Sequence, residues 1–210
     1  MKPTLRIALA LALAFSARAA SATESNQFGI DVAIHGGLDK YDSVGLKNGL
    51  QNLNLSDKSQ LKDASTHVGA TVVLRLSALD LGGIVEIGRP GKSDATTVIG
   101  ALGGLGLDFG PLRLDGLAEL AGHRYGSVLK DSRLVSQSTK DVWLASIGLR
   151  PVLSFRPSNS MWILGVYGFA RWDVTNKSVA VTFADGSGAA GDYKVGGSQY
   201  GAGLQVGFSL

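Results

Sequence analysis

The C-terminal segment, residues 200–210, alternates strictly between apolar side chains and small or polar ones. The apolar phase consists of Tyr200, Ala202, Leu204, Val206, Phe208 and Leu210, and the other phase of Gly201, Gly203, Gln205, Gly207 and Ser209. Alternation with a period of two residues indicates a β-strand, because successive side chains of a strand point to opposite faces. The C-terminus is therefore predicted to be a strand with one wholly apolar face.

The same alternation recurs along the chain. Near its start, one phase contains Phe28, Ile30, Val32 and Ile34, and the other Gly29, Asp31, Ala33 and His35. Further runs predict strands at residues 68–77, around Glu86, and at 97–107, 112–123, 143–150 and 162–172. Glycine is abundant (29 residues) and proline scarce (5), without a collagen-like period, so the glycines must lie inside regular structure. The tally is about eight strands, all of them in antiparallel order.

Three links between these strands are short. The stretch Asp80-Leu81-Gly82-Gly83 suits a tight hairpin, and Asp108-Phe109-Gly110-Pro111 suits another compact turn. A third strand end is predicted near Pro151, because proline fits at the end of a strand. The other connections, at about residues 39–66, 89–96, 124–140 and 173–197, are long or polar. Long and short links alternate, so all the long ones fall at one end of the sheet.

The N-terminus has the pattern of a secretory signal. Lys2 and Arg6 precede a short apolar run, and small residues follow it, with cleavage expected after Ala19 or, preferably, Ala22. Removal of residues 1–22 takes away three of the 20 basic residues and leaves 17 against 17 acidic ones. The mature chain, residues 23–210, is then neutral and about one domain in size, which argues against a nucleic-acid partner. Cysteine is absent, so disulfides and thiolate metal sites are excluded.

Alternation alone does not distinguish a membrane barrel, apolar outside, from a soluble barrel such as a lipocalin, apolar inside. The polar phase contains small residues with Arg, Glu and Asp and almost no Lys, which is typical of a packed interior. Aromatic residues of the apolar phase gather near strand ends, as in two interfacial girdles. They are Phe28, Phe109, Trp162 and Phe208 at one end and Trp143, Trp172 and Tyr200 at the other. The membrane barrel is the favoured interpretation.

A resemblance supports it. The segment from Tyr200 to Leu210 resembles the C-terminal signal by which outer-membrane proteins are recognised for barrel assembly, although the usual last residue is aromatic and here Phe208 lies two residues before Leu210. The mature chain resembles the small OmpA/OmpX-type, porin-like outer-membrane barrels. The resemblance implies an all-β, eight-stranded, antiparallel up-and-down transmembrane β-barrel in a Gram-negative outer membrane, with outward-facing long loops. Its expected partners are outer-membrane lipid, lipopolysaccharide and, through the last strand, the barrel assembly machinery.

The inward phase is predicted to hold a polar network. Its members are Arg75, Glu86, Arg113, Asp115, Glu119 and Arg150. Arg75 and Glu86 are nearly equidistant from the link at Asp80–Gly83, so they are expected to face each other across two strands. A structural network that fills the barrel is favoured over a polar pore or proton-linked gate, because an unpaired buried charge is costly.

No catalytic, cofactor or metal site is predicted. His123, Glu119 and Ser127 suggest a hydrolytic triad, but positions i and i+4 of a strand lie about 13 Å apart. His35 and His67 are interpreted as rim histidines, since two ligands do not make a zinc site. The run Gly103-Gly104-x-Gly106 lies within a predicted strand, and its small residues are interpreted as room inside a narrow barrel.

The predicted function is non-enzymatic. The barrel is expected to anchor surface loops for a structural or surface-interaction role, with an unknown external ligand. Residues 173–197, which include Val179, Val181 and Phe183, are expected to extend as a hairpin above the membrane. The alternatives are a narrow channel for a small or apolar molecule, suggested by Ile163, Tyr167 and Phe169 in the inward phase, and a lipid-A-modifying enzyme.

Overall fold

The computed structural model describes residues 28–42, 48, 64–89, 95–125, 134–135, 142–157, 160–183 and 189–210. Eight strands form a closed barrel in the order β1-β11-β8-β7-β5-β4-β3-β2, with every neighbouring pair antiparallel. These strands are β1 (Phe28–Asp42), β2 (Ala64–Leu76), β3 (Leu79–Arg89), β4 (Thr96–Phe109), β5 (Leu112–Tyr125), β7 (Val142–Phe155), β8 (Trp162–Asp173) and β11 (Ser198–Ser209). The predicted all-β, eight-stranded barrel is confirmed.

The first and last strands close the barrel. Val32 faces Phe208 and Ile34 faces Val206 in the β1–β11 ladder. At its end, Ile30 and Leu210 exchange two backbone hydrogen bonds of 2.8 and 3.0 Å. The C-terminal strand that defines the sequence pattern is therefore the strand that removes the open edge of the sheet.

The alternating phases separate cleanly into an outer and an inner surface. Leu38 and Leu204 are exposed to 69% and 68%, whereas Ile163 in β8 is only 1% exposed. Tyr167 and Phe169 also point inward and are buried. Large apolar side chains thus cover the outside, and the polar phase lines the inside. No helix among the described residues is long and apolar enough to span a bilayer.

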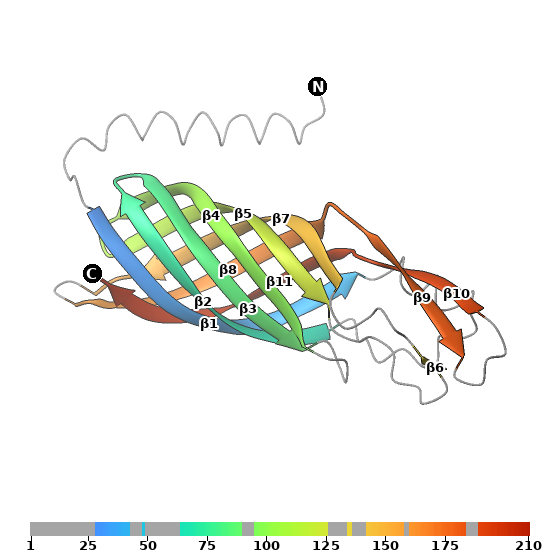
Figure 1. The fold of residues 1–210 in the computed structure, drawn as a ribbon. Helices are drawn as coiled ribbons and strands as arrows, with labels where there is room; N and C mark the ends of the chain where they lie inside the picture. The colour runs from blue at the N-terminus through green and yellow to red at the C-terminus, as the bar shows by residue number, and fades with distance from the viewer. Residues whose placement is uncertain are drawn as a thin grey trace, which may run out of the picture.

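The two ends of the barrel differ (Figure 1). At the end where β1 begins and β11 finishes, called the inner end here, the links at residues 77–78, 110–111 and 156–161 are short. From the opposite, outer end projects a hairpin of β9 (Lys177–Phe183) and β10 (Ala189–Val195), with β6 (Leu134–Val135) pairing to β9. The predicted hairpin within residues 173–197 is confirmed. Most of residues 43–63, 90–94 and 126–141, like the predicted signal at 1–22, lies outside the described residues.

The β2–β3 turn was predicted in the wrong place. It consists of Ser77 and Ala78, and Ser77 has a φ of 61°. The strand resumes at Leu79, so Asp80 and Gly82 belong to β3 rather than to the link. Because the turn lies nearer the N-terminus than the glycines suggested, Arg75 faces Asp80, and Glu86 faces Gly69. The predicted cross-strand pair of Arg75 with Glu86 is therefore wrong.

Pro151 lies inside β7, which continues to Phe155, so the prediction that the strand ends near it is also wrong. Its side chain is on the outer, exposed face. The ladder to β8 keeps its register on both sides of the proline but has no pair between Leu149–Ala170 and Val152–Tyr167. Proline lacks the N–H that a ladder requires, and the barrel tolerates this one gap without bending out of register.

Gly106 in β4 makes room for charged side chains. A Cβ at Gly106 would collide with the Arg113 guanidinium and the Asp115 carboxylate, and the run Gly103–Gly106 lies within a strand. A Cβ at Gly203 in β11 would approach the Tyr167 hydroxyl to 2.7 Å. The interpretation of these small residues as space inside a narrow barrel is confirmed at Gly106.

Candidate functional site

Charged side chains inside the barrel form clusters at successive heights, beginning at the inner end. Arg113 in β5 is almost fully buried and lies among three carboxylates. Its guanidinium donates to Asp115 (2.5 Å), Asp80 (2.8 and 3.0 Å) and Asp108 (2.8 Å). Charge-assisted hydrogen bonds of this kind are the strong ones in proteins, so Arg113 ties β3, β4 and β5 together.

A second pairing closes the same end. Asp31 in β1 pairs with Arg75 in β2 and, at 2.9 Å, with Arg156 in the β7–β8 link. Burial lowers the pKa of Arg156 to about 10 because it disfavours the charged form, and this still leaves the guanidinium protonated at neutral pH. The Asp31 carboxylate therefore joins β1 and β2 to the β7–β8 link on the opposite side of the barrel.

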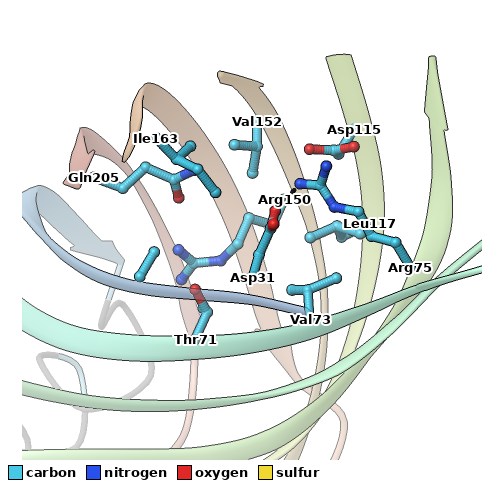
Figure 2. Close-up of a pocket in the computed structure, with 11 residues that line it drawn as sticks. Asp31, Thr71, Val73, Arg75, Asp115, Leu117, Arg150, Val152, Ile163 and Gln205 are labelled. Atoms are coloured by element: carbon cyan, nitrogen blue, oxygen red, sulfur yellow. Dashed lines mark ion pairs between the residues drawn. The ribbon is translucent and has the colours of Figure 1, made fainter. Parts of the chain in front are cut away.

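A cavity of about 30 Å³ lies above these pairs, and it has room for one or two water molecules. Figure 2 shows Arg75 beside Asp31, with Asp115, Arg150 and Gln205 among the other lining residues. Three buried polar atoms of its lining have no protein hydrogen-bond partner: Oδ1 of Asp31, Nε of Arg75 and Nε of Arg150. Its size is far below that of a typical ligand pocket.

An apolar cluster occupies the middle of the barrel. Its buried members are Ile84, Leu102, Leu117, Val152, Tyr167 and Phe169. Tyr167 and Phe169 come from β8, whose inward face was predicted to be unusually apolar. These rings pack against the charged cluster above them instead of lining an open passage, since the Arg150 guanidinium lies 4.7 Å from the centroid of the Tyr167 ring.

The central cluster joins two arginines to two glutamates. Glu86 Oε2 accepts from Arg150 at 2.6 Å and from Arg171 at 2.7 Å. Arg171 also donates to both oxygens of Glu119, at 2.5 and 3.1 Å, and at 2.8 Å to Oε1 of Gln199. Arg171 in β8 thus connects directly to β3, β5 and β11, and Arg150 of β7 joins the same cluster through Glu86.

His35 and His67 are part of this interior and do not lie at the rim, contrary to prediction. Their Nε2 atoms lie 3.8 and 3.7 Å from Glu86 Oε1, and both residues are buried. His67 also contacts Asp39 (3.2 Å) and the Tyr167 hydroxyl (2.5 Å). No group of three or more His, Cys, Asp or Glu residues in the described part of the chain has a geometry that could hold a metal ion.

A roof of hydrogen-bonded side chains lies at the outer end. The hydroxyl of Tyr41 donates to that of Tyr125 at 2.7 Å, and Tyr125 donates to the Asp173 carboxylate. Asp173 also contacts Nδ1 of His123 (3.2 Å) and accepts the backbone N–H of Gly197 at 3.0 Å. Because Gly197 follows β10, the roof ties the root of the projecting hairpin to the barrel. His123 is thus paired within the barrel, and Ser127 lies outside the described residues.

All six residues of the predicted interior network are buried inside the barrel, at two levels. Arg75, Arg113 and Asp115 lie toward the inner end, and Glu86, Glu119 and Arg150 lie in the centre. Sequence reasoning did not name six further charged or polar residues that pair inside the barrel. These are Asp31, Asp39, Asp80, Arg171, Asp173 and Gln199. Alternation would have identified Arg171, which shares the inward phase of Ile163, Tyr167 and Phe169.

The seven aromatic residues predicted for the girdles all lie on the outer face and are exposed by 41–67%. Phe28, Phe109, Trp162 and Phe208 lie at the inner end, where Trp162 faces Phe208 with 4.3 Å between ring centroids. Trp143, Trp172 and Tyr200 lie at the outer end, on the neighbouring strands β7, β8 and β11. The apolar belt between the two groups fits a hydrocarbon environment, because soluble monomers rarely expose apolar patches of this extent.

No protein-family model matches the sequence, and no match to a curated protein was found. The structure is similar to the N-terminal β-barrel domain of Pseudomonas aeruginosa OprF, at 12% identity and a TM-score of 0.50, over 88% of this chain and 100% of the other. It is similar to Neisserial surface protein A (12%, TM-score 0.50, 88% and 97%) and to the outer membrane protein OprG of P. aeruginosa (11%, TM-score 0.52, 86% and 95%). At these identities the likeness shows the fold.

Proposed function

We propose that this chain, an outer-membrane β-barrel by its fold and its apolar belt, is a non-enzymatic anchor that presents its outer loops to partners outside the cell. The observation that carries the proposal is the filled interior, in which successive clusters join strands of the barrel wall, and Arg171 and the Tyr41–Tyr125 pair do so across the lumen. Arg113, Arg171 and the pair of Tyr41 with Tyr125 each bridge strands at a different height. A barrel filled in this way is a rigid support for what projects from it.

The β9–β10 hairpin is the main candidate for the contact surface. It continues beyond the outer end of the barrel, and Asp173 and Gly197 fix its root by backbone and side-chain hydrogen bonds. A rigid root positions a binding segment at a low cost in entropy, which is why loops on rigid scaffolds carry so much recognition.

The orientation of the hairpin can be tested by cysteine labelling, because the native chain has no cysteine. Ser178→Cys in β9 is expected to react in intact cells with a maleimide that does not cross membranes. Ser160→Cys, another exposed position, in the β7–β8 link, serves as the matched control and should react only after the outer membrane is permeabilised. Labelling of Ser160→Cys but not of Ser178→Cys in intact cells would contradict the proposed presentation of the loops.

A narrow conduit remains the alternative, and one observation favours it: polar side chains follow one another along the barrel from Asp31 to Asp173. We expect no stable single-channel steps from the wild-type barrel in a planar lipid bilayer, since the Arg150 and Arg171 guanidiniums lie against aromatic rings that occupy the lumen. Regular, reproducible current steps from the purified wild-type protein would contradict the proposed anchor and support the conduit.

An enzyme that modifies lipid A is the least favoured reading. His123 and Asp173 form an imidazole–carboxylate pair, but the described part of the chain has no nucleophile hydrogen-bonded to His123. We expect lipid A extracted from cells that express the protein to keep its mass. A new mass would contradict the proposal that the protein is non-enzymatic. Recognition of β11 by the barrel assembly machinery is likewise proposed from the pattern of residues 200–210.

A further inference from the structure

The outward-facing charges of the barrel strands are confined to one end. At the inner end, every outward side chain of the described barrel strands is apolar, from Phe28 in β1 to Phe208 in β11. At the outer end, the outward positions include Lys40, Arg89 and Arg124, with Asp42 as the one outward carboxylate among the described barrel strands. Charge on the outer surface is therefore asymmetric across the membrane and is mainly cationic.

The three cations lie along one arc of the rim. Lys40 is in β1, Arg89 in β3 and Arg124 in β5, and the strands between them contribute outward Thr66 and Thr97. Thr66 faces both Leu38 and Arg89, and Thr97 faces both Ile87 and Arg124. We call Lys40, Thr66, Arg89, Thr97 and Arg124 the basic arc.

Strand geometry sets the spacing within the basic arc. Arg89 is two strands from Lys40 and two strands from Arg124, and in each direction it is offset by two residues along the strand. At about 4.8 Å between strands and 3.3 Å per residue, neighbouring cations are roughly 12 Å apart at their Cα atoms. Long flexible side chains can close much of that distance, so two cations and the threonine between them can reach one anionic group.

The depth of the basic arc points to a lipid headgroup. Leu38, Val68, Ile87 and Ile99 lie directly below it on the same face and are exposed by 51–69%. The remaining strands of the rim, β7, β8 and β11, carry Trp143, Trp172 and Tyr200 instead. Aromatic side chains mark the level of the headgroups, so the cations of the arc lie at that level too.

We propose that the basic arc binds the phosphate groups of phosphorylated glycolipids in the outer leaflet, with Arg89 as its central residue. Guanidinium and ammonium groups donate to phosphate oxygens, and the hydroxyls of Thr66 and Thr97 supply further donors. A polyanion in solution would need cations that point away from the membrane, whereas these point outward along the bilayer plane. The inference rests on the location in the outer membrane. It assigns phosphorylated glycolipid to the side of the barrel formed by β1 to β5.

The test uses the mature chain folded in phosphatidylcholine vesicles that contain a small fraction of bisphosphorylated lipid A or of the same lipid after enzymatic removal of its phosphates. The measured quantity is the amount of glycolipid that copurifies with the barrel after mild detergent extraction, at a series of lipid fractions. Wild type is expected to retain the phosphorylated form at least tenfold better than the dephosphorylated one, because each basic residue near an anionic lipid surface contributes about a fivefold preference.

Two double variants, each of which removes two positive charges, distinguish binding by the basic arc from a general effect of net charge. Lys40→Gln with Arg89→Gln is expected to lose most of that preference. Lys177→Gln with Lys194→Gln, which removes two exposed cations of the hairpin, should retain it. Equal retention of the two lipid forms by wild type, or an equal loss in both double variants, would overturn the proposal. All variants should fold in pure phosphatidylcholine, and failure of the wild type to fold there would count against the outer-membrane barrel itself.

Discussion

Replacing Arg171 by methionine is expected to lower the free energy of unfolding by about 3–5 kcal/mol, the usual cost of removing one partner from a buried ion pair. Arg171 is 2% exposed and donates to Glu86, Glu119 and Gln199. Methionine fills a similar volume but leaves Glu119 without its closest cation. Urea titration of the barrel in phosphatidylcholine vesicles, followed by the mobility of unheated samples in gels, measures the loss.

Two further variants show whether the lost stability comes from the stranded charge. Adding Glu119→Gln to Arg171→Met should recover part of the stability, because the stranded carboxylate is then neutral. Arg89→Met, a change of the same kind on the outer face, should alter the stability by less than about 0.5 kcal/mol in a zwitterionic bilayer. A loss below about 1 kcal/mol for Arg171→Met would mean that the central cluster does not hold the barrel together.

Leu204→Arg is expected to destabilise the barrel by about 2–4 kcal/mol, since an arginine at the bilayer midplane must be taken out of water. Leu204 lies midway along β11 opposite Gly36, is 68% exposed and contributes to the apolar belt. On a soluble barrel the same exposed position would accept arginine almost without cost. The free energy of unfolding in phosphatidylcholine vesicles is again the measurement.

Thr66→Arg is the matched control for depth. Thr66 also points outward and is exposed, but it lies at the outer end beside Arg89, where a lipid-facing arginine costs about 0–1 kcal/mol. The cost at Leu204 should therefore exceed the cost at Thr66 by at least about 1 kcal/mol. Equal costs at the two depths would contradict the assignment of the apolar belt to the hydrocarbon core.

Most of the fold could be predicted from the sequence because the phase of a strand is a local property. The alternation at Phe28–His35 and at Tyr200–Leu210 fixed which side chains point outward in the two strands that close the barrel. Turn chemistry was less informative. The glycines at 82 and 83 suggested a link, whereas the turn is formed by Ser77 and Ala78, and the shift changed the partner of Arg75 from Glu86 to Asp80 within its ladder.

The contacts across the barrel could not be predicted from spacing. Glu86 meets Arg150 and Arg171, which are 64 and 85 residues away in the sequence, only because β3 comes to face β7 and β8 once the sheet has closed. The inward phase identified which residues enter the interior but not which of them meet. The roof of Tyr41, Tyr125 and Asp173 was missed for the same reason, since it joins the ends of three strands across the outer mouth.

The outer surface of this barrel requires lipid, and its folding should therefore depend on a bilayer. The most direct test dilutes the mature chain from concentrated urea into phosphatidylcholine vesicles or into buffer alone, and compares the gel mobility of unheated and heated samples. A lipid-dependent barrel should give a form of shifted mobility in vesicles that reverts on heating, and none in buffer. A chain that folds equally well in buffer, or that keeps one mobility in vesicles, would contradict it.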